Sequence, residues 1–269
     1  MSLNTATLGP ARTLKDSVGG CLRHGIGGIS PWRDKIAETG LDRAAKLIRD
    51  AGLTVTGVCR GGMFPAADLA GRRAARDDNR RAVDEAATLA ARCLVLVVGG
   101  LPAGSKDIVD ARAQVEDGIV ETLEYARKAG VPLAIEPMHP MYAADRACVN
   151  TLRQALDICD RLGDGIGVAI DAYHVWWDPD LSAEIARAGL GGRILACHVC
   201  DWLVPTTDLL LDRGMMGDGV IDLKKLRAEV EAAGYDGLVE VEIFSAKNWW
   251  TKSADEVLAT VVERCRACV

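Results

Sequence analysis

The chain has 269 residues, of which 49% are hydrophobic and 26% are charged, a composition typical of globular proteins. This length suits one (β/α)8 barrel, which takes about 250 residues, although two small domains would also fit. No apolar run reaches the roughly 18 residues that a membrane-spanning helix needs, and the start MSLNTATLGP lacks the basic and hydrophobic parts of a secretion signal. We therefore expect a cytoplasmic protein with no membrane partner.

Charge and cysteine content argue against two further classes. The formal net charge of −6 argues against a nucleic-acid partner, because phosphate backbones are bound through basic surfaces. The nine Cys are an odd number and lie scattered in apolar segments. This pattern indicates reduced thiols in the core and no disulfide framework.

Short apolar runs alternate with longer amphipathic stretches along most of the chain, a pattern typical of repeated βα units. The predicted strands span Leu3–Leu8, Gly27–Ser30, Thr54–Cys59, Leu94–Val98, Leu133–Glu136, Gly167–Asp171, Ile194–Val199 and Leu238–Ile243. The predicted helices include Leu41–Ala51, Asn79–Arg92, Val109–Ala129, Thr151–Leu162 and Leu223–Ala233. Glycines suited to a left-handed C-cap follow several of them, at Gly52, Gly130, Gly163 and Gly234. Ser253-Ala-Asp-Glu256 predicts the start of the last helix.

Eight such units without a Pro-, Ser- or Gly-rich linker predict a single (β/α)8 TIM barrel over residues 1–269. The alternative is an open Rossmann-type sheet, which would place a G-x-G-x-x-G turn after an early strand, and the sequence has none. The pattern is weakest around Val18–Gly28, which is rich in glycine and only faintly periodic.

Polar residues close four successive predicted strands, the fifth to the eighth, and these residues are Glu136, Asp171, His198 and Glu242. Because the carboxyl ends of barrel strands converge on one mouth, we expect the four side chains to meet. Three carboxylates crowded together repel one another, and a divalent cation such as Mn²⁺, Mg²⁺, Co²⁺ or Zn²⁺ would hold them ionised. The sequence therefore predicts a site for one divalent metal ion with these four ligands.

Glu240 shares a strand face with Glu242 but lies one pleat, about 6.6 Å, deeper in the barrel. We interpret it as a buried carboxylate neutralised by an ion pair or a proton, and not as a metal ligand.

The motifs in the second half of the chain resemble a known family. They are Glu-Pro after the fifth strand, Asp-x-x-His after the sixth, His-Val in the seventh, Arg-Gly-x-x-Gly-x-Gly in the following loop and Glu-x-Phe after the eighth. These motifs are similar to those of the xylose isomerase-like TIM-barrel superfamily. That group includes ketose 3-epimerases, hydroxypyruvate isomerases, inosose isomerases and dehydratases and, more distantly, endonuclease IV.

The resemblance implies the same four metal ligands, with Glu136 and Glu242 also acting as the catalytic acid/base pair on opposite faces of the substrate. His174 and Arg213 match positions where relatives hold substrate oxygens. The chain departs from ketose 3-epimerases in the longer stretch between His198 and Arg213 and in Met-His-Pro-Met-Tyr after Glu136-Pro. Substrate identity is set in these segments, so the resemblance predicts the reaction type better than the substrate.

Aromatic residues follow the predicted strands, where flat rings can stack on sugars and exclude water. Trp176 is a candidate substrate contact, and His139, in the segment after the fifth strand, is another. The same rings could instead cover the mouth or form a homo-oligomer interface. The set comprises Trp32, Phe64, Tyr142, Trp176, Trp177, Trp202, Trp249 and Trp250.

The predicted activity is that of a metal-dependent sugar isomerase or epimerase, which transfers a proton through an enediolate of a ketose or related polyhydroxy carbonyl compound. The nearest alternative is a metal-dependent dehydratase of a keto-inositol or similar keto-polyol, because it would use the same site. A nuclease of the endonuclease IV type would need several His, whereas the chain has four in all. A non-catalytic sugar-binding subunit would not need all four ligands.

The identity of the small-molecule substrate stays open at this stage. Lys247 and Arg213 could bind a phosphate, but no P-loop supports a phosphorylated substrate. No nucleotide cofactor is expected.

Overall fold

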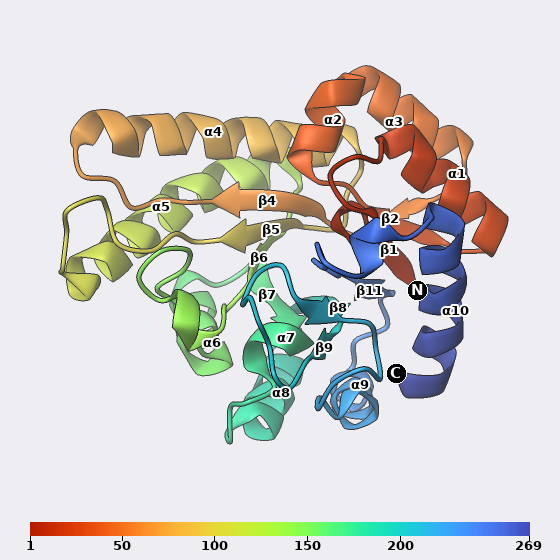
Figure 1. Cartoon of the computed structure of the whole chain (residues 1–269). Helices are drawn as coiled ribbons and strands as arrows, with labels where there is room; N and C mark the ends of the chain where they lie inside the picture. The colour runs from red at the N-terminus through yellow and green to blue at the C-terminus, as the bar shows by residue number, and fades with distance from the viewer.

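Parallel strands form one continuous sheet in the computed structural model, which describes residues 1–269. Along the sheet the strand order is β3-β2-β1-β11-β8-β7-β6-β5-β4 (Figure 1). The strands span β1 Ser2–Asn4, β2 Gly28–Ser30, β3 Thr54–Val55, β4 Val58–Gly62, β5 Leu94–Val97, β6 Leu133–Ile135, β7 Ile166–Asp171, β8 Ile194–Val199 and β11 Val239–Val241. A separate antiparallel pair joins β9, Asp201–Trp202, to β10, Arg213–Gly214.

The sheet closes on itself because β3 and β4, at the two ends of this order, are halves of one strand. The backbone N–H of Thr56 donates to the carbonyl of Ile29 at 3.0 Å, and that of Cys59 donates to the carbonyl of Pro31 at 3.2 Å. On its other side β4 pairs with β5. The predicted eight-stranded TIM barrel is therefore confirmed, with its third strand interrupted after Val55.

Helices surround the strands, as Figure 1 shows. They span α1 Leu14–His24, α2 Arg33–Thr39, α3 Leu41–Asp50, α4 Leu69–Thr88, α5 Ile108–Ala129, α6 Leu152–Leu162, α7 Ala172–Val175, α8 Leu181–Leu190, α9 Leu223–Ala232 and α10 Ala254–Cys268, with 3-10 turns η1 Thr5–Leu8, η2 Pro140–Tyr142 and η3 Trp249–Thr251. None of these helices combines the length and hydropathy that crossing a membrane requires.

One predicted boundary near the N-terminus was wrong, and one helix there was not predicted. The first strand ends at Asn4 instead of Leu8, because the Asn4 side chain accepts a hydrogen bond from the backbone of Ala6 and starts the turn η1. The first part of the glycine-rich segment belongs to helix α1, which the faint periodicity did not reveal. Its Gly20 packs against α10 so closely that a Cβ atom there would lie 2.4 Å from Leu258 Cδ1.

Other helix boundaries also differ. Helix α4 begins at Leu69, ten residues before the predicted start, because Asp68 caps it by accepting from the backbone of Gly71. The last helix starts as predicted, with Ser253 accepting from the backbone of Glu256. Gly130 takes the left-handed conformation that its predicted cap position requires, with φ of 70°.

Small side chains fill the inside of the barrel beneath its mouth. Ala134, Ala169 and Ala196 come one each from β6, β7 and β8 and pack together with Val95 of β5. Because these side chains are short, the same interior also accommodates the buried polar residues from β1 and β11 described below.

Asn79, fully buried in α4, holds the end of β4. Its side chain accepts from the backbone N–H of Gly62 at 2.6 Å and donates to the carbonyl of Gly62 at 2.8 Å. Asn79→Ala would leave both buried groups without a partner, so we expect it to lower the free energy of unfolding by about 2–5 kcal/mol. Urea denaturation measures this, with Arg80→Ala on the exposed face of α4 as the control. Equal stability of the two variants would show that the hydrogen bonds between Asn79 and Gly62 do not stabilise the fold.

Candidate metal centre

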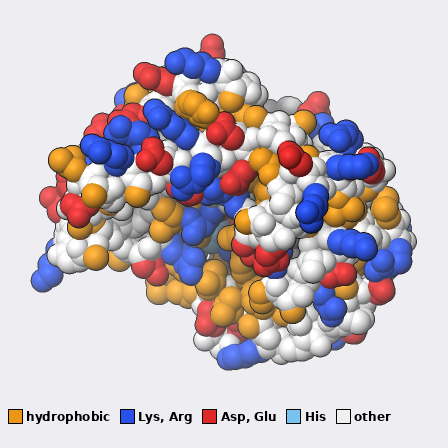
Figure 2. Space-filling view, turned by 90° about the horizontal axis from the view of Figure 1, so that it is seen from above, with side chains coloured by type: hydrophobic (Ala, Val, Ile, Leu, Met, Phe, Trp, Pro, Cys, Tyr) orange, Lys and Arg blue, Asp and Glu red, His pale blue; other side chains and the backbone are white.

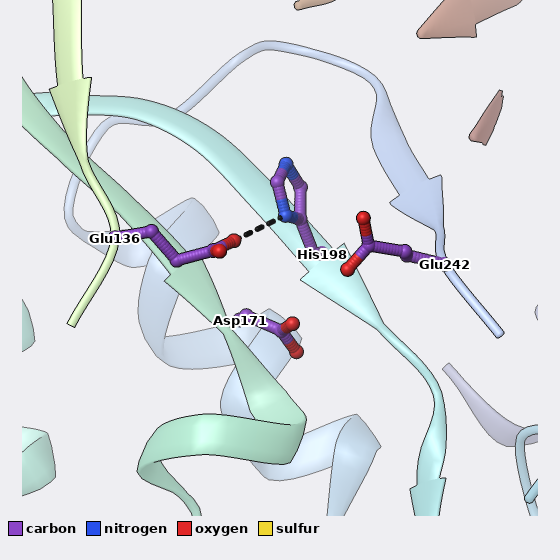
Figure 3. A group of neighbouring side chains, drawn as sticks. All are labelled: Glu136, Asp171, His198 and Glu242. Atoms are coloured by element: carbon purple, nitrogen blue, oxygen red, sulfur yellow. Dashed lines mark hydrogen bonds and ion pairs between the residues drawn. The ribbon is translucent and has the colours of Figure 1, made fainter. Parts of the chain in front are cut away.

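The four predicted ligands meet at the mouth of the barrel. Glu136 directly follows β6, Asp171 ends β7, His198 lies in β8 and Glu242 directly follows β11. All four side chains are buried, and one ligand atom from each lies within 4.8 Å of those of the others. Figure 3 shows Glu136 and Glu242 pointing toward each other from opposite sides, with His198 between them. The strand-end pattern thus predicted a set that the fold brings together.

Direct contacts link these side chains to one another and to Arg213. Nδ1 of His198 lies 2.9 Å from Oε1 of Glu136. Nη1 of Arg213 donates to Oδ2 of Asp171 at 3.3 Å and to Oε2 of Glu242 at 3.1 Å. The arginine is fully enclosed, so it neutralises part of the carboxylate charge.

Burial raises the pKa of two carboxyl groups of the site. Burial raises the pKa of Asp171 to about 6, with Arg213 opposing the shift. The pKa of Glu242 is also raised by burial and lowered in part by Arg213. For His198 burial lowers the pKa, but the carboxylates of Glu240 and Glu136 outweigh it and hold the pKa well above its usual value. The group therefore takes up protons readily when no other cation is present.

The residues fit a divalent cation on grounds of charge and of distance. Four buried carboxylates face one arginine and one imidazole, which leaves an excess of negative charge. Ligand atoms that bind one ion at about 2.0–2.3 Å lie at most about 4.6 Å apart, close to the spread of this group. The ligand candidates are Glu136, Asp171, His198 and Glu242. The fourth carboxylate, Glu240, is not one of these ligands.

Glu240 forms the floor of the site. Its Oε1 accepts from Nδ2 of Asn4 at 2.8 Å, and its Oε2 accepts from Oγ1 of Thr56 at 2.8 Å. Oε1 also lies 3.5 Å from Nε2 of His198. Asn4 is fixed in turn, because its Oδ1 accepts from Nε1 of Trp32 at 2.8 Å. Glu240 is thus a buried carboxylate beside the imidazole of His198, whose Nδ1 faces Glu136. A carboxylate at this place is suited to orienting a ligand imidazole.

Glu240→Gln is expected to weaken divalent metal binding by about 10- to 100-fold, because the imidazole of His198 loses the carboxylate that orients it. Calorimetric titration of chelator-treated protein with Mn²⁺ or Zn²⁺ measures the change. Glu263→Gln, on the exposed face of α10, is the matched control. Metal affinity equal to that of the unmodified protein would show that Glu240 does not position the ring.

The β9–β10 hairpin places Arg213. The backbone N–H of Arg213 donates to the carbonyl of Phe244 at 2.9 Å, and the guanidinium lies 4.4 Å from the ring centre of Tyr173 and 4.9 Å from that of Phe244. Asp201 fixes the loop after β10, since its carboxylate accepts from the backbones of Gly217 and Gly219, each at 2.9 Å. The predicted glycine-rich motif therefore folds around one carboxylate.

His174 lies beside Arg213 in the short helix α7. Its Nε2 is 3.2 Å from Nη2 of Arg213, and its Nδ1 accepts from the backbone N–H of His139 at 3.3 Å. Burial and the charge of Arg213 hold the pKa of His174 well below its usual value, so the ring is neutral. Asp171 starts α7 by accepting from the backbone of Tyr173 at 2.8 Å.

A cavity of about 230 Å³ opens beside this group. Glu136, Glu242, His174 and Arg213 contribute to its wall, as expected for residues of one site. Met138 and Phe244, which lie in motifs named above, also line it, whereas sequence reasoning missed Arg60, Arg146 and Leu210. Arg60 directly follows the third predicted strand. The metal ligands were predicted because they lie at the carboxyl ends of strands, and the same reasoning could have identified Arg60. Arg146 lies in an irregular loop and gave no signal.

His139 and Trp176, both expected to contact substrate, do not line the cavity. The His139 ring stacks on Trp202 at 4.8 Å between ring centres, and Trp176 lies 5.7 Å from the same residue. His139 is held there because its Nδ1 accepts from the backbone of Met141 and starts the turn η2. Of the six Trp only Trp32 reaches the cavity wall.

Acidic and basic side chains are interspersed over the face drawn in Figure 2, with several Lys and Arg side chains beside the hollow near the middle of the view. A closed parallel barrel with a buried three-carboxylate, one-imidazole group at its mouth defines the class of this protein as a TIM barrel with a candidate metal centre.

The chain belongs to the xylose isomerase-like TIM barrel family, whose model matches residues 21–264. A Sinorhizobium meliloti 1021 protein of known crystal structure is 64% identical, with a TM-score of 0.98 over 100% of this chain and 98% of that chain. The IOLI protein, solved with a zinc atom bound, is 22% identical, with a TM-score of 0.84 over 100% of this chain and 97% of that one. At that identity the likeness shows the fold alone.

Among curated proteins, the inosose isomerase of Halalkalibacterium halodurans is 29% identical over 146 residues, which are 53% of this chain and 49% of that protein. The chain therefore spans about half the length of this relative. The resemblance in the strand-end motifs is confirmed at the level of the family, and the distant relatives include isomerases.

Proposed function

We propose that the protein is a divalent-metal-dependent isomerase or epimerase of a ketose or related polyhydroxy carbonyl compound. The observation that carries this proposal is the convergence of Glu136 and Glu242 from opposite sides of one cavity, beside Asp171 and His198. The relationship to an inosose isomerase and the zinc in the IOLI protein support it.

Glu136, Asp171, His198 and Glu242 would hold the cation, which when bound polarises the substrate carbonyl and offsets the negative charge of an enediolate. One of the two glutamates removes a proton from the carbon next to the carbonyl, and the other returns a proton. Return to the opposite face of the same carbon gives an epimer, and return to the neighbouring carbon gives an isomer.

The other cavity residues position the substrate and keep water away. Arg213 is fixed by Asp171 and Glu242 and lies beside neutral His174, so its guanidinium would present polar hydrogens to substrate oxygens. Trp32 and Phe244 form an aromatic wall, with their ring centres 5.5 Å apart. An apolar wall protects the enediolate from protonation by solvent.

The test is exchange of a carbon-bound hydrogen with D₂O, with Mn²⁺, Mg²⁺, Co²⁺ or Zn²⁺ present, over a panel of ketoses and keto-inositols. Deuterium in recovered substrate or its isomer, without loss of water, is the expected result. Loss of water from the substrate would instead indicate the dehydratase that shares this kind of site. Absence of metal-dependent exchange with every compound would count against both reactions.

A further inference from the structure

Two arginines of the cavity wall have no acidic partner in the protein. Arg60 and Arg146 are half-buried, and neither forms an ion pair or a side-chain hydrogen bond. Arg33, which is also half-buried, is paired with Asp78 at 2.8 Å and with Glu85 at 2.6 Å. The guanidinium groups of Arg60 and Arg146 are therefore free to bind something that enters the cavity.

An irregularity in β4 directs Arg60 into the cavity. Along the β4–β5 ladder Cys59 pairs with Val95 and Gly61 pairs with Leu96, so Arg60 is an extra residue in its strand. In a regular strand, successive side chains point to opposite faces, and Arg60 would face away from Cys59. A bulge removes this restriction, and both Cys59 and Arg60 line the cavity.

Arg146 approaches the same space from the loop after β6. Its backbone N–H donates to the carbonyl of Tyr142 at 3.0 Å, and its guanidinium lies 5.8 Å from the ring centre of Tyr142. The hydroxyl of Tyr142 donates in turn to the carbonyl of Leu209 in the loop that covers the mouth. This arrangement holds Arg146 at the rim, beside Leu210 of the same cavity.

The two positive charges disfavour each other. Burial lowers the pKa of Arg60, and the charge of Arg146 lowers it further. The third cavity arginine, Arg213, differs from these two because it is paired with Asp171 and Glu242. Guanidinium groups match carboxylate and phosphate oxygens with two parallel hydrogen bonds, so an oxyanion is the group that this pair of side chains fits.

We propose that Arg60 and Arg146 bind an acidic group of the substrate, so that the enzyme acts on an anionic keto sugar instead of a neutral one. The group is a carboxylate or a phosphate at the end of the molecule away from the reacting carbons. The cavity volume is about 230 Å³, below the roughly 300–1,000 Å³ typical of pockets for drug-sized ligands. This volume suits a substrate as small as a single sugar unit. The proposal rests on the proposed function for the reaction itself, whereas the anion site can be tested without turnover.

The first measurement uses chelator-treated protein titrated calorimetrically with inorganic phosphate and, separately, with acetate. The unmodified protein should bind at least one of the two anions, and Arg60→Gln/Arg146→Gln should weaken that binding at least tenfold. Arg60→Lys/Arg146→Lys, which keeps the charge, should retain part of it and guards against misfolding of the first variant. Arg73→Gln, exposed on α4, is the control and should bind like the unmodified protein.

The second measurement compares metal-dependent D₂O exchange of D-fructose, D-fructose 6-phosphate and D-fructuronate, which differ only in the group at the far end. Faster exchange of either anionic compound, with the advantage lost in the glutamine double variant, supports the proposal. The compound that exchanges faster shows whether the two arginines bind a phosphate or a carboxylate. Binding of neither anion to unmodified protein, or equal binding to the double variant, would overturn it. Failure of exchange with every sugar would refute the proposed function but leave the titration result standing.

Discussion

Glu242→Gln is expected to lower the rate of substrate hydrogen exchange by about 10²- to 10⁴-fold without unfolding the protein, because one of the two proton-transferring groups is lost. Gln has the same size as Glu and can still accept the hydrogen bond that Asn4 Nδ2 gives to Glu242 Oε1 at 2.9 Å. What disappears is the basic oxygen that faces Glu136 across the cavity.

The rate is measured as deuterium incorporation with saturating metal, using a substrate identified in the D₂O panel. Metal binding is measured on the same preparation, because Glu242 is also a candidate ligand and weakened binding must be separated from lost proton transfer. Glu124→Gln, exposed on α5, serves as the control. A Glu242→Gln protein with unchanged exchange at saturating metal would refute the two-base scheme.

Metal addition should stabilise the protein, and more strongly at neutral than at acidic pH. A free cation at 100 times its dissociation constant adds about 2.7 kcal/mol to the free energy of unfolding. Without metal, burial raises the pKa of Asp171 from 3.8 to about 6. The folded state then binds a proton more tightly than the unfolded chain, so this contribution to stability is complete below pH 4 and is lost as the pH rises through 6.

A metal ion competes with that proton for the carboxylate of Asp171, so its stabilising effect should grow between pH 5 and pH 7.5. Thermal unfolding with and without Mn²⁺ at the two pH values measures this effect. Asp171→Asn provides the comparison, since an amide removes both the charge and the titration. Equal stabilisation by Mn²⁺ at both pH values, or in the Asn variant, would show that the ion binds elsewhere.

The carboxylate and imidazole ligands could be predicted from sequence because their placement depends on only two rules. Apolar runs mark the strands, and a parallel barrel brings all carboxyl strand ends to one mouth. Glu136, Asp171, His198 and Glu242 each close an apolar run, so no further detail of packing was needed. Glu240 followed from the same alternation, which placed it one pleat below Glu242.

Side chains beyond the strand ends were less predictable. His139 and Trp176 lie in segments that follow strands, but His139 starts a turn and Trp176 ends a short helix, and both rings pack against Trp202 and away from the cavity. Helix α1 was missed because glycines weakened its periodicity, although Gly20 is needed for close packing against Leu258.

By itself the sequence determined the barrel and the set of four metal-type ligands, because hydrophobic periodicity and strand polarity are local properties. Only the tertiary structure decided what surrounds these ligands. Arg60 enters the cavity through a one-residue bulge in β4, and Arg146 enters it from a loop whose path depends on Tyr142 and Leu209. Such positions are set by contacts between distant segments, which leave no regular pattern along the chain.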